Sequence, residues 1–489
     1  MDKTRELVRG TFWSYAGITL TLILGLATNV ILARMLDKEN WGALSTLITV
    51  VSFLTTLVDL GLNYFILYVV SSGSHKSQEE IRASLAAPLR YKLILVFLIG
   101  LSIFIFAEPL SAIFKIENGA IYFIESAVFF VVLNVFTVLD LIFSGLKRFR
   151  ESSMITTLQN IIRLSVAYAL VLFGFGITGA MTGYITAVFL SVVVQFILLR
   201  PYLSVSGGKK ESVANMFEYG FFFGVSSLAA TISLWTDSII IGLFIGPVAV
   251  GVYRIAVSIA MSVGGLIGGV NKVIFPVLAS AEGRGEDSIN DLNRAIKYSS
   301  FIAFPAVVGL ALSSDALVRV FFGAQYADSA IPLMLLSFIC FDMMFTSLLS
   351  SYLGAKKRTK IIGYSAVATS IANVVLNVIL IPFIGMIGAA IASVSTRLFN
   401  AFLLFEWSRR NLNSRIDLSS FSIPLMGSLG MGIVLLVIRQ AMNPADSVIH
   451  LFVFVGIGMA SYAAMSQLLG FNIFDVGKKI LSAFIRPQS

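Results

Sequence analysis

The sequence predicts an all-α polytopic membrane protein with fourteen transmembrane helices, in two pseudo-symmetric six-helix lobes followed by two C-terminal helices. Three observations predict this fold. The 489 residues are 57% hydrophobic and 12% charged, whereas a soluble protein carries about 25% charged residues. The apolar stretches are each close to the roughly 20 residues that span a bilayer. Lys and Arg are concentrated in every second gap between those stretches.

The apolar stretches predict helices, because backbone polar groups inside a bilayer must be satisfied within each segment. The first stretch is longer than the apolar core of a signal peptide and no cleavage site stands out, so we interpret it as a retained helix. In chain order the predicted helices lie near 11–34, 42–71, 89–114, 119–144, 152–174, 177–199, 215–244, 248–279, 296–322, 327–353, 360–383, 385–408, 421–441 and 447–470.

The gaps predict the orientation. Odd-numbered gaps hold few basic residues, whereas the two ends of the chain and the even-numbered gaps hold many. Examples of the latter are Lys76, Arg82, Arg90 and Lys92; Lys147, Arg148 and Arg150; Lys356, Lys357, Arg358 and Lys360; and Arg409, Arg410 and Arg415. Because cytoplasmic loops carry the excess of Lys and Arg, we expect a cell membrane protein with both termini in the cytoplasm. The same rule explains the net charge of +9, so nucleic acid is not an expected partner.

An internal repeat divides the chain. A shift of 209 residues aligns several landmarks: Gly42 with Gly251, Gly145 with Gly354, and GITGA (176–180) with GMIGA (385–389). Each copy would contain six helices, an even number, so the copies have the same orientation, as in transporters with parallel repeats. The predicted domains are an N-terminal lobe (1–200), a C-terminal lobe (210–410), two further helices (418–471) and a cytoplasmic amphipathic tail (472–489).

Sequence features that would indicate an enzyme are missing. One cysteine, Cys340, and two histidines exclude a disulfide framework and a Cys-rich or His-rich metal centre. The chain contains no GxxxxGK[ST] phosphate loop, no GxSxG and no HExxH, the motifs typical of nucleotide hydrolysis, serine hydrolysis and zinc proteolysis. We therefore expect a non-enzymatic protein without a cofactor, and leave open a coupling ion, Na⁺ or H⁺.

The functional residues are expected among polar groups inside the predicted helices, because charges there are rare and usually face the bundle interior or a water-filled cavity. The cationic candidates for substrate binding are Arg34, Arg163, Arg254, Lys272 and Arg397. The candidates for lining a cavity or binding a coupling ion are Asp59, Asn63, Asp237, Asn271 and Asp342. For the carboxylates an alternative stays open, in which they pair with arginines and hold the bundle together.

The predicted helix 248–279 is the most informative. Arg254 and Lys272 are 18 residues apart, which is five helical turns, so they would share one face about 27 Å apart. We interpret them as a cationic stripe. Between them GGLIGG contributes Gly264, Gly265, Gly268 and Gly269. Such glycines favour close helix packing, and a hinge is the alternative.

The segment ILARMLDKENWGALSTLITVVSFLTTLVDLGLN (31–63) carries a family resemblance. A hydrophobic-Ala-Arg-x-Leu run ends the first helix, Trp41–Gly42 opens the second, and Asp59–Leu60–Gly61 lies late in it. The second copy echoes this pattern with Asp237 and GPVAVGVY (246–253). With its six-plus-six-plus-two helices, the chain resembles the polysaccharide flippases of the multidrug/oligosaccharidyl-lipid/polysaccharide exporter superfamily.

This resemblance implies two lobes around a cavity lined by helices 1, 2, 7 and 8. It implies transfer of a polyprenyl-(pyro)phosphate-linked oligosaccharide or polysaccharide repeat unit, such as an O-antigen unit, to the outer leaflet by alternating access. An ion gradient, the membrane potential or product removal would supply energy. Membrane lipids, a polysaccharide polymerase and glycosyltransferases are the implied partners. Arginine and lysine in a wet cavity suit a diphosphate.

Several alternatives stay open. A flippase for the peptidoglycan lipid precursor would have the same architecture and a similar headgroup. An ion-coupled multidrug or cation antiporter of the same superfamily would use the carboxylates Asp59 and Asp237, although such proteins typically have twelve helices. A membrane polymerase would need a large extracytoplasmic loop, and the predicted gaps are too short for one.

Overall fold

The computed structural model describes residues 2–59, 61–72, 78–203, 213–268, 271–412, 414–445 and 447–470. The regular structure in this part of the chain is entirely helical, as predicted. Eleven helices among these residues are long and apolar enough to cross a membrane. The chain is therefore an all-α, multi-pass membrane protein. The predicted amphipathic tail, 472–489, lies outside the described residues.

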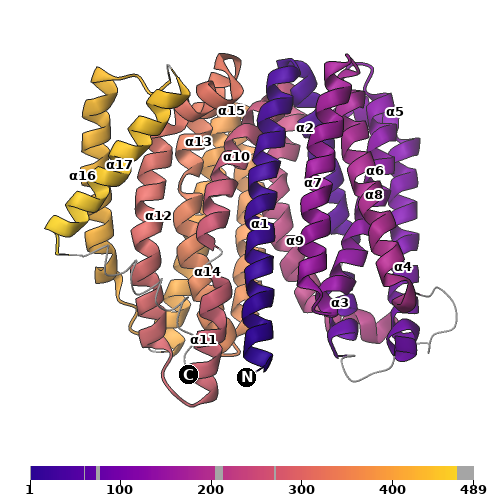
Figure 1. Cartoon of the computed structure of the whole chain (residues 1–489), viewed down its shortest axis with the longest axis horizontal. Coiled ribbons are helices and arrows are strands. Elements are labelled where there is room, and N and C mark those ends of the chain that lie inside the picture. Colours follow the sequence, from indigo (N-terminus) through magenta and orange to yellow (C-terminus); the bar gives the residue numbers. More distant parts are fainter. Residues whose placement is uncertain are drawn as a thin grey trace. The chain divides into compact units, whose positions relative to one another are not determined.

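The described part of the chain contains the following helical elements, of which Figure 1 labels those named α. They are α1 (Asp2–Met35), α2 (Lys38–Asp59), α3 (Leu62–Ser72), α4 (Gln78–Ile105), α5 (Ala107–Ile113), α6 (Ala120–Gly145), α7 (Phe149–Leu172), α8 (Gly176–Leu199), η2 (Arg200–Tyr202), α9 (Val213–Phe244), α10 (Pro247–Gly268), α11 (Asn271–Gly283), α12 (Ile289–Leu317), η3 (Val318–Phe322), η4 (Ala324–Ser329), α13 (Ala330–Leu336), α14 (Ile339–Ala355), α15 (Thr359–Leu412), η5 (Leu418–Phe421), α16 (Ser422–Ala441) and α17 (Val448–Leu468).

The predicted segments are all occupied by helix, but four of them are interrupted. The segment 42–71 is split into α2 and α3, 89–114 into α4 and α5, 248–279 into α10 and α11, and 327–353 into η4, α13 and α14. The first interruption has a visible cause, because Gly61 has φ +85°, a conformation that favours glycine and ends a helix. The predicted break after residue 383 is present inside α15, where Ile384 and Gly385 have non-helical backbone angles.

The chain divides into two compact units. Unit 1 comprises Met1–Arg254 and Ala366–Ala389, and unit 2 comprises Ile255–Ser365 and Ala390–Ser489. In unit 1, α7 packs against α1 and α8, α6 packs against α4 and α8, and α9 packs against α2 and α3. Buried apolar side chains of α3, α4 and α6, among them Phe65, Leu85 and Phe143, form a core there. In unit 2, α12 packs against α14 and α16, around a core that includes Phe301, Met431 and Phe454.

Two glycines that the repeat aligned meet in unit 1. A Cβ atom on Gly42 of α2 would lie 2.5 Å from the carbonyl oxygen of Pro247, and one on Gly251 of α10 would lie 2.8 Å from the Cα of Gly42. Trp41 Nε1 donates a hydrogen bond to the Gly251 carbonyl at 3.1 Å. Only glycine permits this approach of two helix backbones, which places α10 directly against the start of α2.

The repeat also has local structural counterparts. Gly176 and Gly385, which the repeat aligned, have φ +52° and φ +60°. The basic turns that follow α6 and α14 contain Lys147 at φ +60° and Lys357 at φ +59°. Both turns are closed by the same backbone pattern, since Arg148 N donates to Phe143 O and Arg358 N donates to Leu353 O. Corresponding segments of the two copies therefore adopt the same backbone conformation.

Candidate functional site

Arg254 is the cation that the structure holds most distinctively. It lies in the second turn of α10, is half-buried, and belongs to a helix that is apolar enough to cross a membrane. Its guanidinium carbon lies 4.5 Å from the ring centroid of Trp235 on α9. Such a cation–π contact contributes about 0.5 to 2 kcal/mol. It fixes the planar group against an aromatic face without neutralising the charge.

Asp237, on the same helix as Trp235, is buried and accepts hydrogen bonds from neutral donors. Tyr253 Oη donates to its Oδ2 at 2.8 Å, and Asn377 Nδ2 donates to its Oδ1 at 2.6 Å. Asn377 Nδ2 also lies 3.0 Å from Asn373 Oδ1. The carboxylate attracts the charge of Arg254 through space. Asn377 Oδ1 is buried and has no hydrogen-bond partner among the described residues, so this cluster retains an unused acceptor.

Asp59 and Asn63 meet at the break between α2 and α3. The Asn63 backbone N–H donates to Asp59 Oδ1 at 2.8 Å. A third residue joins them from α4, where Lys92 Nζ donates to Asn63 Oδ1 and lies 3.9 Å from Asp59 Oδ1. The Lys92 side chain is 1% exposed. The sequence analysis counted Lys92 among the basic residues of a gap, although the helix predicted at 89–114 contains it, and the structure buries it within α4.

Arg163 lies on α7 and is also half-buried. One of its terminal nitrogens donates to Asn160 Oδ1 at 2.8 Å, and its guanidinium carbon lies 5.0 Å from the Tyr184 ring centroid. Its Nε is buried without a hydrogen-bond partner among the described residues. Arg34 occupies the last turn of α1 and is exposed. Both predicted cations therefore lie in unit 1, as Arg254 does.

Asp342 and Arg397 pair with each other in unit 2. An Arg397 terminal nitrogen lies 2.6 Å from Asp342 Oδ2, and Thr346 Oγ1 donates to Asp342 Oδ1 at 2.7 Å. The side chains are 11% and 23% exposed, respectively. This geometry joins α14 to α15 and compensates both charges. Sequence reasoning had placed the two residues in different candidate groups, one for the substrate and one for a coupling ion.

Lys272 and Asn271 begin α11, but their side chains lie outside the described part of the structure. Because α10 ends at Gly268 and α11 starts at Asn271, the shared face of Arg254 and Lys272 stays a prediction.

Gly264 and Gly268 lie against α14, where an added Cβ would be 3.1 Å from Ile339 Cγ2 and 3.4 Å from Met343 Sδ, respectively. These distances support close helix packing. Gly265 is half-buried in α10, and Gly269 is outside the described residues.

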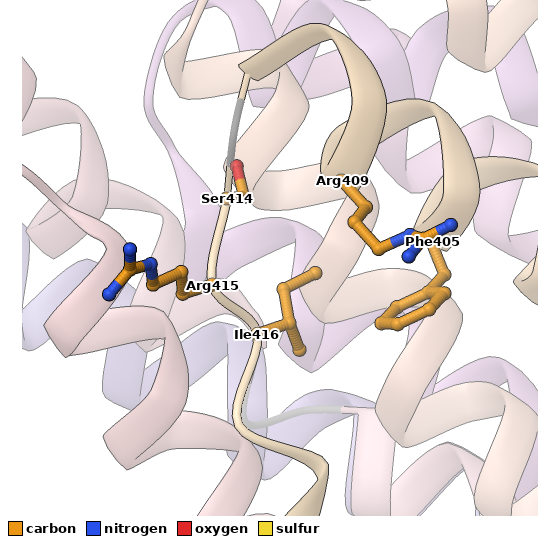
Figure 2. Close-up of a pocket in the computed structure, with 5 residues that line it drawn as sticks. All are labelled: Phe405, Arg409, Ser414, Arg415 and Ile416. Carbon is orange, nitrogen blue, oxygen red and sulfur yellow. The ribbon is translucent and has the colours of Figure 1, made fainter.

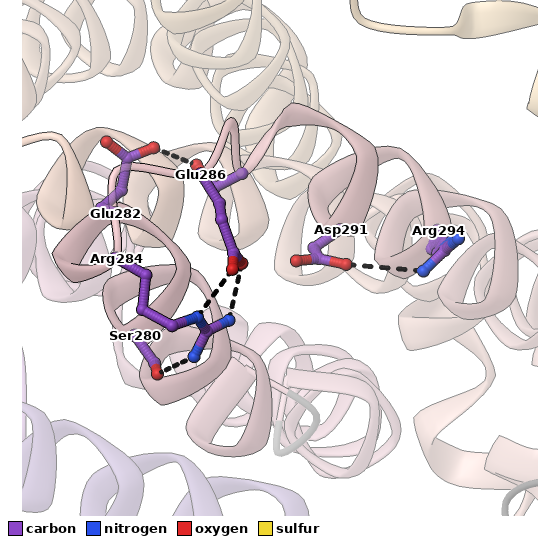
Figure 3. Close-up of polar contacts among 7 residues, drawn as sticks. Ser280, Glu282, Arg284, Glu286, Asp291 and Arg294 are labelled. Carbon is purple, nitrogen blue, oxygen red and sulfur yellow. Dashed lines mark hydrogen bonds and ion pairs between the residues drawn. The ribbon is translucent and has the colours of Figure 1, made fainter.

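One end of unit 2 carries a network of charged side chains around the turn between α11 and α12, shown in Figure 3. Arg284 binds Glu286 through two nitrogens, at 2.9 and 2.7 Å, and donates to Ser280 Oγ at 2.7 Å. Lys356, which follows α14, lies 2.6 Å from Glu282 Oε1. Burial alone would lower the pKa of Lys356, but the hydrogen bond to Glu282 and nearby negative charges raise it above its usual value.

An open cavity of about 620 Å³ lies at the segment that follows α15 (Figure 2). Two hydrogen bonds hold this segment to α12, since Asn293 Nδ2 donates to Arg415 O and Asp417 N donates to Asn293 Oδ1, both at 3.0 Å. The lining residues are Phe405, Arg409, Ser414, Arg415 and Ile416. No group of three or more metal-ligating side chains occurs among the described residues.

Sequence reasoning missed the neighbours that define these clusters. Trp235, Tyr253 and Asn377 surround Asp237 and Arg254, and Tyr184 supports Arg163. One signal was available, because Asn373 and Asn377 are one turn apart in an otherwise apolar segment and polar residues at that spacing share a helix face.

Comparisons with known proteins agree with this architecture. Residues 7–282 match the family described as "Polysaccharide biosynthesis protein". The chain is 24% identical over 350 residues to the probable flippase AglR of Haloferax volcanii, covering 69% of this chain and 71% of that protein. It is 20% identical over 411 residues to a putative O-antigen transporter of Shigella flexneri, covering 82% of this chain and 97% of the transporter.

A solved structure shares the fold. It is the lipid II flippase MurJ in an inward closed conformation, with a TM-score of 0.77 at 16% sequence identity, covering 93% of this chain and 98% of MurJ. At this identity the likeness concerns the fold alone.

Proposed function

This chain belongs to the polysaccharide biosynthesis protein family, within the polysaccharide flippases of the multidrug/oligosaccharidyl-lipid/polysaccharide exporter superfamily, and from that premise we propose its substrate and direction of transport. The protein moves a polyprenyl-(pyro)phosphate-linked oligosaccharide or polysaccharide repeat unit from the cytoplasmic to the outer leaflet of the cell membrane by alternating access. The names of the Haloferax and Shigella relatives, a flippase and an O-antigen transporter, support this proposal.

The single observation that carries the proposal is Arg254, a half-buried cation held on the face of Trp235 inside an apolar helix. A charge at membrane depth is costly and usually serves a substrate or ion. Because the aromatic ring orients the guanidinium without neutralising it, its nitrogen donors can bind a planar pair of phosphate oxygens. A diphosphate headgroup needs such donors, since it cannot cross hydrocarbon alone.

The proposal gives a different role to each of the other predicted cations. Arg163 has a buried Nε without a partner among the described residues, so it retains capacity to donate to the glycan or its phosphate. Arg34 would act at the exposed end of α1, and Lys272 at the start of α11. Arg397 is compensated by Asp342, so it could bind substrate only after that pair separates.

Energy coupling is assigned to Asp237. Its carboxylate lies with the amide groups of Asn377 and Asn373, and the unused Asn377 Oδ1 adds an oxygen ligand of the kind that hard cations prefer. Binding of Na⁺ or H⁺ at Asp237 would weaken its attraction for Arg254 and thereby change how firmly that cation is held. Asp59, beside Lys92, is a poorer ion site.

The cellular setting follows from the same proposal. The protein is a transporter and not an enzyme, lies in the cell membrane, and has both termini in the cytoplasm. It receives the lipid-linked glycan from glycosyltransferases and delivers it to a polysaccharide polymerase on the outer side.

The test uses cells that lack this protein and carry either the wild type, Arg254→Ala or the control Arg319→Ala. Arg319 forms an exposed pair with Asp315, so its loss should have little effect. We expect lipid-linked glycan to accumulate on the inner leaflet in cells without the protein. Wild type and the control should clear it, whereas Arg254→Ala should clear it at least tenfold more slowly, the cost of one charge-assisted phosphate contact.

Two outcomes would contradict the proposal. If the precursor that accumulates is the peptidoglycan precursor, the substrate is that lipid. If no precursor accumulates and the cells become sensitive to cationic drugs, the protein is an antiporter that uses Asp237 to bind a cation.

A further inference from the structure

Asp140 is a further carboxylate inside a membrane span, and no cation compensates it among the described residues. It is half-buried in α6, which is apolar enough to cross a membrane. Ser152, in the first turn of α7, donates a hydrogen bond from Oγ to Asp140 Oδ1 at 2.6 Å. No lysine or arginine forms an ion pair with Asp140 within the described part of the chain. Because an isolated charge at membrane depth is costly, such a carboxylate usually serves an ion or a substrate.

The basic turn that follows α6 does not supply the missing cation. Lys147 is exposed. Arg148 Nε donates to Glu151 Oε1 at 3.0 Å, and its guanidinium lies over the ring of Phe143. The arginine of this turn is thus already paired, and Asp140 remains beside a neutral hydroxyl.

Gln195 of α8 is a buried amide that lacks partners. It is 0% exposed, and neither its Oε1 nor its Nε2 has a hydrogen-bond partner among the described residues. Leaving a buried polar group unsatisfied costs free energy, so nearly all such groups in proteins are bound by protein, water or an ion. An amide of this kind therefore indicates a ligand that completes its surroundings.

The helices α6 and α8 of unit 1, labelled in Figure 1, pack against each other and run in the same direction. Thr178, near the start of α8, forms a side-chain hydrogen bond to Glu125, near the start of α6. Further along both helices, the rings of Tyr184 and Phe129 meet edge to face with centroids 5.7 Å apart. These two contacts set the register of the pair.

This register places Gln195 at the level of Asp140. Asp140 is 11 residues beyond Phe129, and Gln195 is 11 residues beyond Tyr184. Eleven residues make about three turns of an α-helix, so each residue lies on the same helix face as the ring that precedes it. Ser152 reaches the same place from α7. A carboxylate, a hydroxyl and an amide from three helices therefore come together at one end of the bundle.

The second copy of the repeat has apolar residues at the three equivalent positions. The shift of 209 residues aligns Asp140 with Leu349, Ser152 with Ile361, and Gln195 with Leu404. Leu349 and Leu404 are 0% exposed. The same arrangement of helices thus packs well with leucine at these positions, so packing alone does not require the polar residues of the first copy.

We propose that Asp140, Ser152 and Gln195 bind a small monovalent cation, with Na⁺ as the probe. Carboxylate, hydroxyl and amide oxygens are the ligands that hard cations prefer. The hydroxyl of Ser152 keeps lone pairs for the ion while it donates to the carboxylate. A single carboxylate balances a single positive charge, which favours a monovalent ion over Mg²⁺ or Ca²⁺. The ion joins α6, α7 and α8, and this site does not depend on the function proposed above.

The experiment uses the full chain in a neutral detergent, in the background Asp237→Asn, so that an ion at Asp237 does not contribute. Binding of radioactive Na⁺ is measured by equilibrium dialysis, and the thermal unfolding midpoint is followed as Na⁺ replaces choline at constant ionic strength. We expect saturable Na⁺ binding and a midpoint that rises with Na⁺ concentration. Adding Asp140→Asn should weaken binding at least tenfold, because a charged ligand is lost, and Ser152→Ala should weaken it about fivefold.

Gln195→Leu separates a ligand from an amide that is merely buried. In choline this variant should have a higher unfolding midpoint, because the unsatisfied amide is gone. In Na⁺ it should bind the ion about fivefold more weakly and gain less from it. A residue with a purely structural role would show only the first effect.

Two further variants serve as controls. The triple variant Asp140→Leu, Ser152→Ile and Gln195→Leu copies the second repeat, so it should fold and its midpoint should not respond to Na⁺. Asp315→Asn removes a carboxylate that is paired with Arg319, and it should leave Na⁺ binding unchanged.

Three results would overturn the proposal. Absence of saturable Na⁺ binding in the Asp237→Asn background would mean that water satisfies Gln195. Equal Na⁺ affinity with and without Asp140→Asn, or with the triple variant, would place the ion elsewhere. A midpoint that follows pH but not Na⁺ would show that Asp140 binds only a proton. Since glycan transport is not measured, each of these failures is distinct from failure of the proposed function.

Discussion

Asp59 and Asp237 are two intramembrane carboxylates of unit 1 with different surroundings. Asp59 lies at a helix break with the ammonium group of Lys92 at 3.9 Å and a backbone hydrogen bond from Asn63. Asp237 lies about two turns before the end of α9 and accepts hydrogen bonds from the neutral groups of Tyr253 and Asn377. A cation beside a buried carboxylate compensates its charge and resists any second cation. Neutral donors stabilise the charge but leave it able to attract Na⁺, H⁺ or Arg254.

The two positions, which the sequence analysis grouped together, therefore differ in how their charge is compensated. Through Asp59 and Asn63, Lys92 connects α4 to the break between α2 and α3. We propose that the charge of Asp237 changes partner during transport, and we assign energy coupling to it on that basis. Three substitutions at these two sites can break or sharpen this distinction, and a fourth, at an ion pair outside the spans, is expected to have the smallest effect on stability.

Replacing Lys92 by methionine should have the largest effect. The substitution leaves Asp59 in a bundle without its cation, and removing one member of a buried pair costs about 3 kcal/mol. The free energy of unfolding, measured by denaturant titration in detergent, should fall by that amount. The double variant Lys92→Met with Asp59→Asn has no uncompensated charge and should recover most of the loss. If the double variant is as unstable as the single one, the pair is not what stabilises this region.

Replacing Tyr253 by phenylalanine should cost about 2 kcal/mol, because it removes a hydrogen bond to a charged carboxylate. The aromatic ring remains, so packing of α10 against α9 is preserved. The same unfolding measurement tests the value, with Tyr122→Phe as a control for loss of a tyrosine hydroxyl elsewhere. An effect no larger than that of Tyr122→Phe would mean that Asp237 does not depend on this donor.

Replacing Asp237 by asparagine should cost only about 1 kcal/mol in stability, since an amide can still accept from one neighbour and donate to another. Glycan clearance should nevertheless fall at least tenfold, because the charge that we assign to coupling is gone. Asp59→Asn is the matched variant, and it should show the reverse pattern, a larger loss of stability with a smaller loss of transport per folded molecule. Equal patterns in both variants would remove the distinction between the two sites.

The smallest effect is expected outside the spans, at the pair of Lys356 and Glu282. Lys356→Met should lower stability by less than about 1 kcal/mol, because the pair is partly exposed to solvent. Burial opposes the shift in the pKa of Glu282, but hydrogen bonds from Lys356 and Ser288 lower it below 4.5, and the pKa of Lys356 is raised above 10.5.

The contribution of this pair should therefore be constant between about pH 5 and 10. It should be lost as pH falls through the lowered pKa of Glu282, and lost as pH rises through the raised pKa of Lys356. The measurement is the difference in unfolding midpoint between wild type and Lys356→Met across pH. A difference that changes near pH 7 would point to another group.

The sequence alone was sufficient to predict the class of fold. Segments such as 119–144 and 152–174 correspond closely to α6 and α7, because a bilayer dictates the length and composition of any helix that crosses it. The break after residue 383 was predictable from Pro382 and Gly385. The break at Gly61 was not recognised, because the residues on both sides of it are equally apolar and hydrophobic length alone cannot show an interruption.

The candidate site was predicted as a set of residue types, not as an arrangement. Arg254, Asp237 and Asp59 stand out in the sequence because charges are rare in apolar segments. Their pairings do not, since Asn377 is 140 residues from Asp237 and Lys92 is 29 residues from Asn63. Lys92 was counted with a gap for the same reason, since its burial beside Asp59 and Asn63 depends on contacts between helices.

The sequence by itself determined that this protein is an all-α membrane protein with a repeat, because hydrophobic length, charge asymmetry and recurring glycines are local properties of the chain. Only the tertiary structure decided which buried charge has which neighbour: Lys92 beside Asp59, Tyr253 and Asn377 on Asp237, and Trp235 under Arg254. The physical reason is that compensation of a charge depends on distances of a few ångströms between different helices, which the pattern along any single helix does not contain.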